Sequence, residues 1–197
     1  MSDLIYVELS QANVSQDVLH SFDCKHPDFN NFLSNDALNL SADGEGVTYI
    51  LVDKNEYQEK NITVIFAFAT IQAMSLHYRA DVSDMLCSIS CVEIKYFAIN
   101  RRLQKQIAYN IDANKYYSTI FFELFLQDLY ELSTKCVGFQ AIFLRANKNG
   151  EKLYKRKHFI DASNYIVPYT EDDPTGKCIP MILNISTSIY DIFGVDI

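Results

Sequence analysis

Residues 62–69 read Ile-Thr-Val-Ile-Phe-Ala-Phe-Ala, an almost unbroken apolar run in the first half of the chain. A run of this length, rich in β-branched and aromatic residues, predicts a strand that is covered on both faces. Segments 91–99 and 139–144 predict two more strands, and between them residues 119–132 place large apolar side chains at helical spacing. Strands that alternate with a long apolar helix indicate an α/β domain.

The rest of the chain completes a predicted order of β-α-β-β-β-α-β-α-β-β. The other predicted elements are strands at 4–9, 47–52 and 178–185, helices at 27–39 and 149–157, and a β-ribbon at 158–160 with 165–167. The polar residues 53–61 predict a hairpin turn. Residues 71–90 have no firm pattern and predict a long connection. We see no repeat or low-complexity linker, so a single domain over residues 1–197 is expected.

The overall charge limits the classes of partner. A net charge of −8 argues against nucleic acid, although basic clusters at 101–105 and 145–157 are either solvated faces or phosphate sites. The five cysteines form no Cys-x-x-Cys pair, so reduced thiols and no metal are expected. The sequence begins without a signal-like segment and has no run of membrane-spanning length, which predicts a cytoplasmic protein without membrane contact.

Residues 22–38 carry the most specific motif: Phe-Asp-Cys-Lys-His-Pro-Asp-Phe-Asn-Asn-Phe-Leu-Ser-Asn-Asp-Ala-Leu. This phrase resembles the opening of small bacterial members of the GNAT superfamily of N-acetyltransferases, including its toxin-like branch. The resemblance extends over about residues 4–185. It implies the GNAT (acyl-CoA N-acyltransferase) fold, a mixed central sheet of about six to seven strands flanked by helices, with acetyl-CoA as co-substrate.

The same resemblance implies where acetyl-CoA binds. Its pantetheine arm would pair with the backbone of Phe97, Ala98 and Ile99, although an ordinary central strand would contain the same residue types. In the family, a glycine-rich turn and the helix after it then bind the pyrophosphate. Here the turn reads Ile-Asn-Arg-Arg-Leu-Gln-Lys-Gln over residues 99–106, without glycine, and about ten residues separate it from the apolar helix. The residues implied to bind the CoA phosphates are Arg101, Arg102, Gln104, Lys105, Ser118 and Thr119.

Two accounts of this degenerate turn stay open. In the first, the lengthened loop still binds the pyrophosphate through its cations and through amides near the helix start, where Ser118 is the predicted N-cap. In the second, the missing glycines mean that acetyl-CoA no longer binds, because Cβ atoms crowd the anion.

The stretch at 149–159 is the third similarity to the family. Tyr154 aligns with the tyrosine that protonates the departing CoA thiolate in many members, a suitable role for a phenol donor. A half-buried aromatic residue of an amphipathic helix is the alternative. His158 stands where the family has glycine. Glu93 is the candidate base, unless it forms a salt bridge with Lys95 or another cation.

The resemblance implies an acetyl-CoA-dependent N-acetyltransferase that acetylates a primary amine of a small molecule or peptide by direct attack in a ternary complex. One alternative is a catalytically inactive GNAT-like binding protein. Another is a toxin that acetylates aminoacyl-tRNA and pairs with a small antitoxin. The apolar segment at 189–195 leaves a homodimer as an option.

Overall fold

The structure is a computed structural model that describes residues 3–79, 86–148, 150–163 and 178–185. The chain divides into two compact units, Met1–Gln72 with Lys95–Asp128 and Ala73–Ile94 with Leu129–Ile197, and each is described by itself. Whether the chain acts as one domain stays a prediction. Within the described ranges, no helix is long and apolar enough to cross a membrane.

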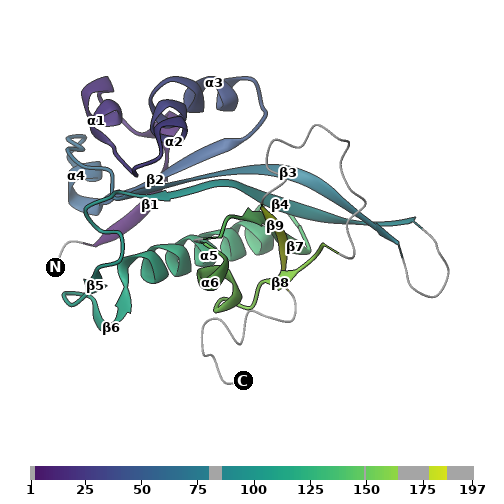
Figure 1. The fold of residues 1–197 in the computed structure, drawn as a ribbon. Coiled ribbons are helices and arrows are strands. Elements are labelled where there is room, and N and C mark those ends of the chain that lie inside the picture. Colours follow the sequence, from purple (N-terminus) through teal and green to yellow (C-terminus); the bar gives the residue numbers. More distant parts are fainter. Residues whose placement is uncertain (1–2, 80–85, 149, 164–177, 186–197) are drawn as a thin grey trace. The chain divides into compact units, whose positions relative to one another are not determined.

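The predicted mixed sheet is confirmed. Among the described residues it has seven strands in the order β1-β2-β3-β4-β7-β9-β8, and β5 and β6 form a separate pair (Figure 1). The strands are β1 (Leu4–Glu8), β2 (Val47–Asp53), β3 (Ala67–Arg79), β4 (Leu86–Ile99), β5 (Ile107–Ala108), β6 (Asp112–Tyr116), β7 (Ala141–Ala146), β8 (Ile160–Asp161) and β9 (Ile179–Asn184). Pairing of β4 with β7 is parallel, and that of β1 with β2, β2 with β3, β7 with β9 and β8 with β9 is antiparallel.

The N-terminal helices of the first unit follow local signals. α1 (Gln16–Ser21) begins after Ser15, whose hydroxyl accepts a hydrogen bond from the Val18 amide at 3.3 Å. α2 (Pro27–Asn31), a π-helical turn η2 (Phe32–Asp36) and α3 (Ala37–Ala42) follow one another without a break. This stretch confirms the helix predicted at 27–39, with proline in its first turn, whereas α1 was not predicted.

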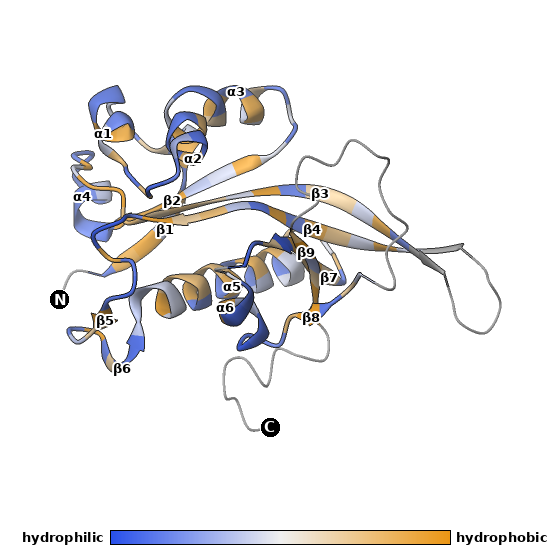
Figure 2. Ribbon diagram, viewed as in Figure 1, coloured by the Kyte–Doolittle hydropathy of each residue, from blue (hydrophilic) through white to orange (hydrophobic). Residues whose placement is uncertain are grey.

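The sheet of the first unit is buried on both faces. Ile50 and Val52 of β2 pack in one core cluster with Leu33 of the helical stretch. Leu51, between them, packs in another cluster with Phe121 of α5 (Tyr117–Lys135). Because successive strand side chains point to opposite faces, all three β2 residues reach 0% exposure. Figure 2 shows this as apolar colour along the central strands.

The second unit has an apolar core of its own. Cys91, Ala141 and Phe143 cluster with Leu76 of β3. The short helix α6 (Glu151–Lys155) is hydrophilic throughout most of its length (Figure 2) and lies within the helix predicted at 149–157.

Several predicted boundaries are wrong. The segment at 71–90 is no long connection, because β3 runs to Arg79 and β4 starts at Leu86. Ile62 and Ile65 are buried, yet the strand starts only at Ala67, since apolar composition reports burial and not pairing. The turn at 53–61 contains α4 (Lys54–Gln58), which Asp53 caps by accepting hydrogen bonds from two amides at 2.8 and 3.2 Å. The predicted strand at 165–167 and the segment at 189–195 lie outside the described residues.

Candidate functional site

The turn after β4 is closed by its own backbone. The Asn100 amide donates to Phe66 O at 2.9 Å, and the Asn100 side chain and carbonyl accept hydrogen bonds from the amides of Arg102 and Leu103. The amides of Gln104 and Gln106 also donate within the turn. These N–H groups are therefore already bonded, unlike the outward-pointing amides of a typical pyrophosphate turn.

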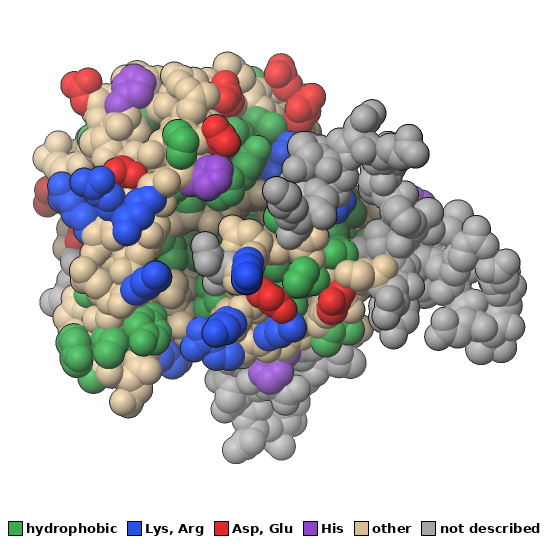
Figure 3. Space-filling view, in the orientation of Figure 1, with side chains coloured by type: hydrophobic (Ala, Val, Ile, Leu, Met, Phe, Trp, Pro, Cys, Tyr) green, Lys and Arg blue, Asp and Glu red, His purple; other side chains and the backbone are tan. Residues whose placement is uncertain are grey.

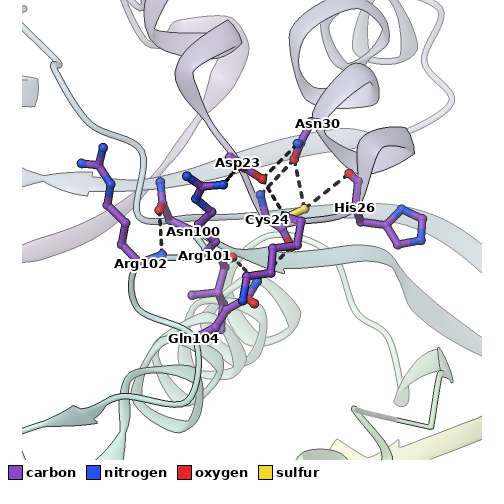
Figure 4. Close-up of polar contacts among 10 residues, drawn as sticks. Asp23, Cys24, His26, Asn30, Asn100, Arg101, Arg102 and Gln104 are labelled. Carbon is purple, nitrogen blue, oxygen red and sulfur yellow. Dashed lines mark hydrogen bonds and ion pairs between the residues drawn. The ribbon is translucent and has the colours of Figure 1, made fainter.

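Arg101 and Gln104 contact the N-terminal motif. The Arg101 amide donates to Asp23 O at 2.7 Å, and its Nη1 lies 2.8 Å from Asp23 Oδ2. Gln104 Nε2 donates to Cys24 O at 3.0 Å and to Ile99 O at 2.9 Å (Figure 4). Gln104 was predicted as a phosphate ligand, but its side-chain amide donates its hydrogen bonds to carbonyl groups of the protein. Asp23 was not singled out from the sequence, because its partner lies far along the chain.

Arg102 and Lys105 are the cations that remain on the turn. Both side chains are exposed, and neither forms an ion pair within the described part of the chain. The Arg102 guanidinium points away from the Asp23 network (Figure 4). Lys105 adopts φ +58°, the left-handed conformation that glycine favours. Lys105, which replaces a glycine of the family's turn, therefore keeps a glycine-like backbone conformation in spite of its side chain.

The residues between the turn and α5 form the small hairpin β5–β6 and not an open loop. Ile107 pairs with Tyr116, and the Tyr117 amide donates to Gln106 O at 3.1 Å. The hairpin therefore returns the chain to the turn, so that the N-terminus of α5 starts beside it. Ser118 and Thr119 lie in the first turn of this helix, so the prediction of Ser118 as its N-cap is wrong.

A pocket of about 380 Å³ lies beneath the hairpin. Its lining residues are Leu4, Phe66, Leu103, Asn110, Ile111, Tyr117 and Phe121. Figure 3 shows hydrophobic side chains over the hairpin, where Tyr109 is 75% exposed. The pocket shares Leu103 with the turn and Tyr117 with the helix start, but has few polar groups to fix a ligand.

The backbone of β4 is freed from β7 near its end. Parallel pairing runs from Cys91↔Ala141 to Ile94↔Leu144. In the described residues no β7 partner follows, although β4 continues to Ile99. Ala98 and Ile99 are buried, and the Phe97 ring packs on Phe122 with centroids 5.0 Å apart. The three residues predicted to bind pantetheine therefore have fixed side chains and backbone groups without a β7 partner.

Glu93, in the second unit, is paired with a cation. Its Oε1 lies 3.8 Å from Arg145 Nε, and the two side chains are 14% and 28% exposed. The Arg145 guanidinium also lies over the Phe143 ring, 5.6 Å from its centroid. The pairing expected as the alternative to catalysis is thus present, with Arg145 in place of Lys95.

Tyr154, on α6, is packed against glycine and an aromatic ring. Its ring centroid lies 5.9 Å from that of Phe159. A Cβ atom at Gly150 would come within 2.7 Å of Tyr154 Cε2. Burial raises the pKa of Tyr154 above its ordinary value, so the phenol stays protonated at neutral pH. His158 has φ +62°, again the conformation of the glycine it replaces.

Lys and Arg side chains gather over α6 (Figure 3). Lys155 pairs with Glu151 at 2.6 Å, and Arg156 Nε donates to Lys152 O at 3.0 Å. Part of this basic cluster is therefore neutralised locally. Groups of acidic, His and Cys side chains that could hold a metal ion do not occur in the portion that the structure describes.

No protein-family model and no curated protein sequence matches this chain. Solved structures do match. A bacterial toxin has a TM-score of 0.71 at 14% identity, with 100% of this chain and 99% of that chain covered. AtaT complexed with acetyl-methionyl-tRNAfMet has a TM-score of 0.66 at 19% identity, with 93% and 96% covered. A tyrosine-to-phenylalanine mutant of the AtaT toxin, bound to acetyl-CoA and the C-terminus of the antitoxin AtaR, has a TM-score of 0.66 at 18% identity, with 98% and 99% covered.

These similarities extend over nearly the whole of each chain and show the fold. The chain has the GNAT fold that the sequence predicted. The argument from net charge against nucleic acid as a partner is not supported, because AtaT, with the same fold, is complexed with a tRNA.

Proposed function

We propose that this protein is an acetyl-CoA-dependent N-acetyltransferase. The observation that carries the proposal is the backbone of β4 beyond Ile94, which has no described β7 partner while its side chains are held by the core. An extended amide-containing ligand such as the pantetheine arm binds such a strand by main-chain hydrogen bonds. The fold that this chain shares with AtaT, which is bound to acetyl-CoA in its solved structure, supports the proposal.

The turn after β4 suits an anion through its side chains. Arg102 and Lys105 are exposed cations without an ion pair among the described residues, and the N-terminus of α5 begins beside the turn. The first-turn amides of Ser118 and Thr119 add the positive end of the helix dipole. Arg101 contributes less, since Asp23 already pairs with it. The proposed phosphate ligands are therefore Arg102 and Lys105, assisted by the helix start.

Acetyl-CoA supplies a thioester whose carbonyl carbon accepts the amine and whose sulfur departs as a thiolate. Tyr154 would hold its proton at Oη for that sulfur. Because burial raises the pKa of Tyr154 above about 10, and a thiol has a pKa of about 8.5, complete proton transfer is uphill. Tyr154 is therefore proposed as a hydrogen-bond donor to the developing thiolate. Glu93 stays a candidate base, although its carboxylate already forms an ion pair with Arg145, which stabilises the deprotonated form and makes it a weaker base.

The acceptor is proposed to be a primary amine, which must attack in its neutral form. A small molecule or a peptide is the simplest source. The α-amine of an aminoacyl-tRNA is a second candidate, and the complex of AtaT with acetyl-methionyl-tRNAfMet favours it specifically. The basic side chains over α6 supply charge for such a polyanion (Figure 3).

Isothermal titration with acetyl-CoA tests the proposal first, and micromolar affinity is expected. Release of free CoA thiol is then followed with polyamines, lysine peptides and charged tRNA as separate acceptors. An acetylated product from any of them supports the proposal and identifies the acceptor class. Failure to bind acetyl-CoA at millimolar concentration would leave a GNAT-fold binding protein without this activity.

A further inference from the structure

Two neighbouring residues of the N-terminal motif hold the turn after β4 at both ends. Asp23 accepts the Arg101 amide through its carbonyl and pairs with the Arg101 guanidinium through its carboxylate, at 2.7 and 2.8 Å. The Cys24 carbonyl accepts Gln104 Nε2 at 3.0 Å. These contacts bridge 80 residues of sequence between Cys24 and Gln104. The motif and the turn therefore form one bonded assembly (Figure 4).

The motif side of this assembly is itself braced. Asp23 Oδ1 accepts the Lys25 amide at 2.7 Å and lies 3.4 Å from Asn30 Nδ2. Asn30 Oδ1 accepts both the amide and the thiol of Cys24, at 3.0 and 3.1 Å. The Lys25 amide, aided by Asn30 and Arg101, lowers the pKa of Asp23, which keeps it a carboxylate. Asn30, from α2, therefore holds Asp23 and Cys24, and these two residues hold the turn after β4.

The turn needs such a brace because it lacks glycine. Lys105 sits at φ +58°, a conformation that costs roughly 1–2 kcal/mol for a residue with a Cβ atom. Conformations of this kind persist only where surrounding contacts over-determine them. Gln104, directly before Lys105, bonds to the carbonyls of Cys24 and Ile99, and so ties the strained end of the turn to two fixed points.

We propose that Gln104 and Asn30 are positioning residues for recognition of the CoA phosphates, acting through the turn that presents Arg102 and Lys105. The inference rests on the proposed function. It assigns Gln104 to holding the turn, and not to contacting the phosphate. A purely structural role would affect stability, but would not distinguish ligands with phosphates from ligands without them.

The test compares acetyl-CoA with S-acetylpantetheine, which keeps the thioester arm but has no phosphates. Gln104→Met retains side-chain volume and removes both donors, and dissociation constants are measured by isothermal titration. We expect acetyl-CoA to bind about tenfold more weakly, as two lost hydrogen bonds allow, with S-acetylpantetheine changed by less than about twofold. Gln106→Met is the matched control, because this exposed side chain of the same turn has no hydrogen bond among the described residues, and wild-type affinity is expected.

Asn30→Ala provides a second variant, in case Gln104→Met melts below the assay temperature by circular dichroism. It leaves the turn intact and loosens Asp23 and Cys24, so about a threefold loss with the same ligand selectivity is expected. Equal losses for both ligands, or no loss for either, would overturn the positioning role while the wild-type titration upholds the proposed function. A wild type that binds S-acetylpantetheine and acetyl-CoA with equal affinity would also refute it, because the phosphates would then contribute nothing.

Discussion

Gly150→Ala tests the role of Tyr154 without altering the tyrosine. Gly150 has φ −83° and ψ −25°, so alanine fits the backbone. The added Cβ would stand 2.7 Å from Tyr154 Cε2, 3.3 Å from Cζ and 3.4 Å from Oη. Ordinary van der Waals contact begins at 3.4 Å, so the ring has to retreat by about 0.7 Å at its Cε2 edge. The substitution should therefore displace the Tyr154 ring, which carries the proposed hydrogen-bond donor, by steric contact.

The size of the effect follows from that displacement. A misplacement of about 1 Å at a reacting centre costs up to about 100-fold in rate, so a 10- to 100-fold lower kcat is expected. Overpacking destabilises the fold by roughly 1–3 kcal/mol, which the loss of glycine flexibility offsets by about 0.4–1 kcal/mol. The variant protein should thus remain folded at 25 °C while turnover falls. The KM for acetyl-CoA should change little, since Tyr154 is proposed to act on the departing sulfur and not to bind the cofactor.

Steady-state release of CoA thiol measures kcat, and urea unfolding measures stability. Gly138→Ala is the matched control, because nothing lies within 4 Å of a Cβ built at Gly138. In a Tyr154→Phe background, Gly150→Ala should cause less than a threefold further loss, since the hydroxyl is already absent. Wild-type kcat in Gly150→Ala, or an undiminished loss in the Phe background, would show that the Tyr154 hydroxyl has no part in turnover.

Three further predictions concern other sites. Lys105→Gly should raise the free energy of unfolding by up to about 1 kcal/mol, because the left-handed penalty of about 1–2 kcal/mol outweighs the entropy that glycine loses; a lower urea midpoint would contradict this. Glu93→Gln should lower kcat less than about tenfold because the carboxylate pairs with Arg145, whereas a loss of 100-fold or more would identify Glu93 as the base. Burial raises the pKa of Cys91 to about 11, so iodoacetamide at pH 8 should label exposed Cys136 first and Cys91 only on unfolding, as followed by mass spectrometry.

The sequence predicted the parts of the fold that side-chain periodicity records. The helix at 119–132 and the inner strands are examples, since their apolar residues report burial directly. The strand at 71–79 was missed although Met74, Leu76 and Tyr78 alternate with polar residues, a period of two that is typical of a strand. The hairpin at 107–116 was missed because its first strand has only two residues, too few to show a period.

The candidate site residues were predicted from residue type and motif position. What the prediction missed are their hydrogen-bond and salt-bridge partners. Gln104 was correctly placed on the turn after β4. Its hydrogen bond to the Cys24 carbonyl, 80 residues away, could not be read from local pattern. The same holds for Glu93, for which a salt bridge with Lys95 or another cation was the predicted alternative, and whose partner is Arg145 on the neighbouring strand β7. The sequence shows which residues are charged. It does not show the strand register, which determines which charged residues lie opposite each other.

A turn that binds phosphate through side chains should respond to salt differently from one that uses backbone amides. Arg102 and Lys105 are exposed, and exposed charges are screened strongly once the Debye length falls below about 10 Å, near 0.1 M salt. Amides at a glycine-rich turn are fixed dipoles close to the ligand and are screened less. Raising NaCl from 50 to 500 mM should therefore weaken acetyl-CoA binding about tenfold or more by titration calorimetry, and Arg102→Ala should flatten that dependence. An affinity that is independent of salt would mean that backbone groups bind the pyrophosphate, and that the hydrogen bonds closing this turn open when acetyl-CoA binds.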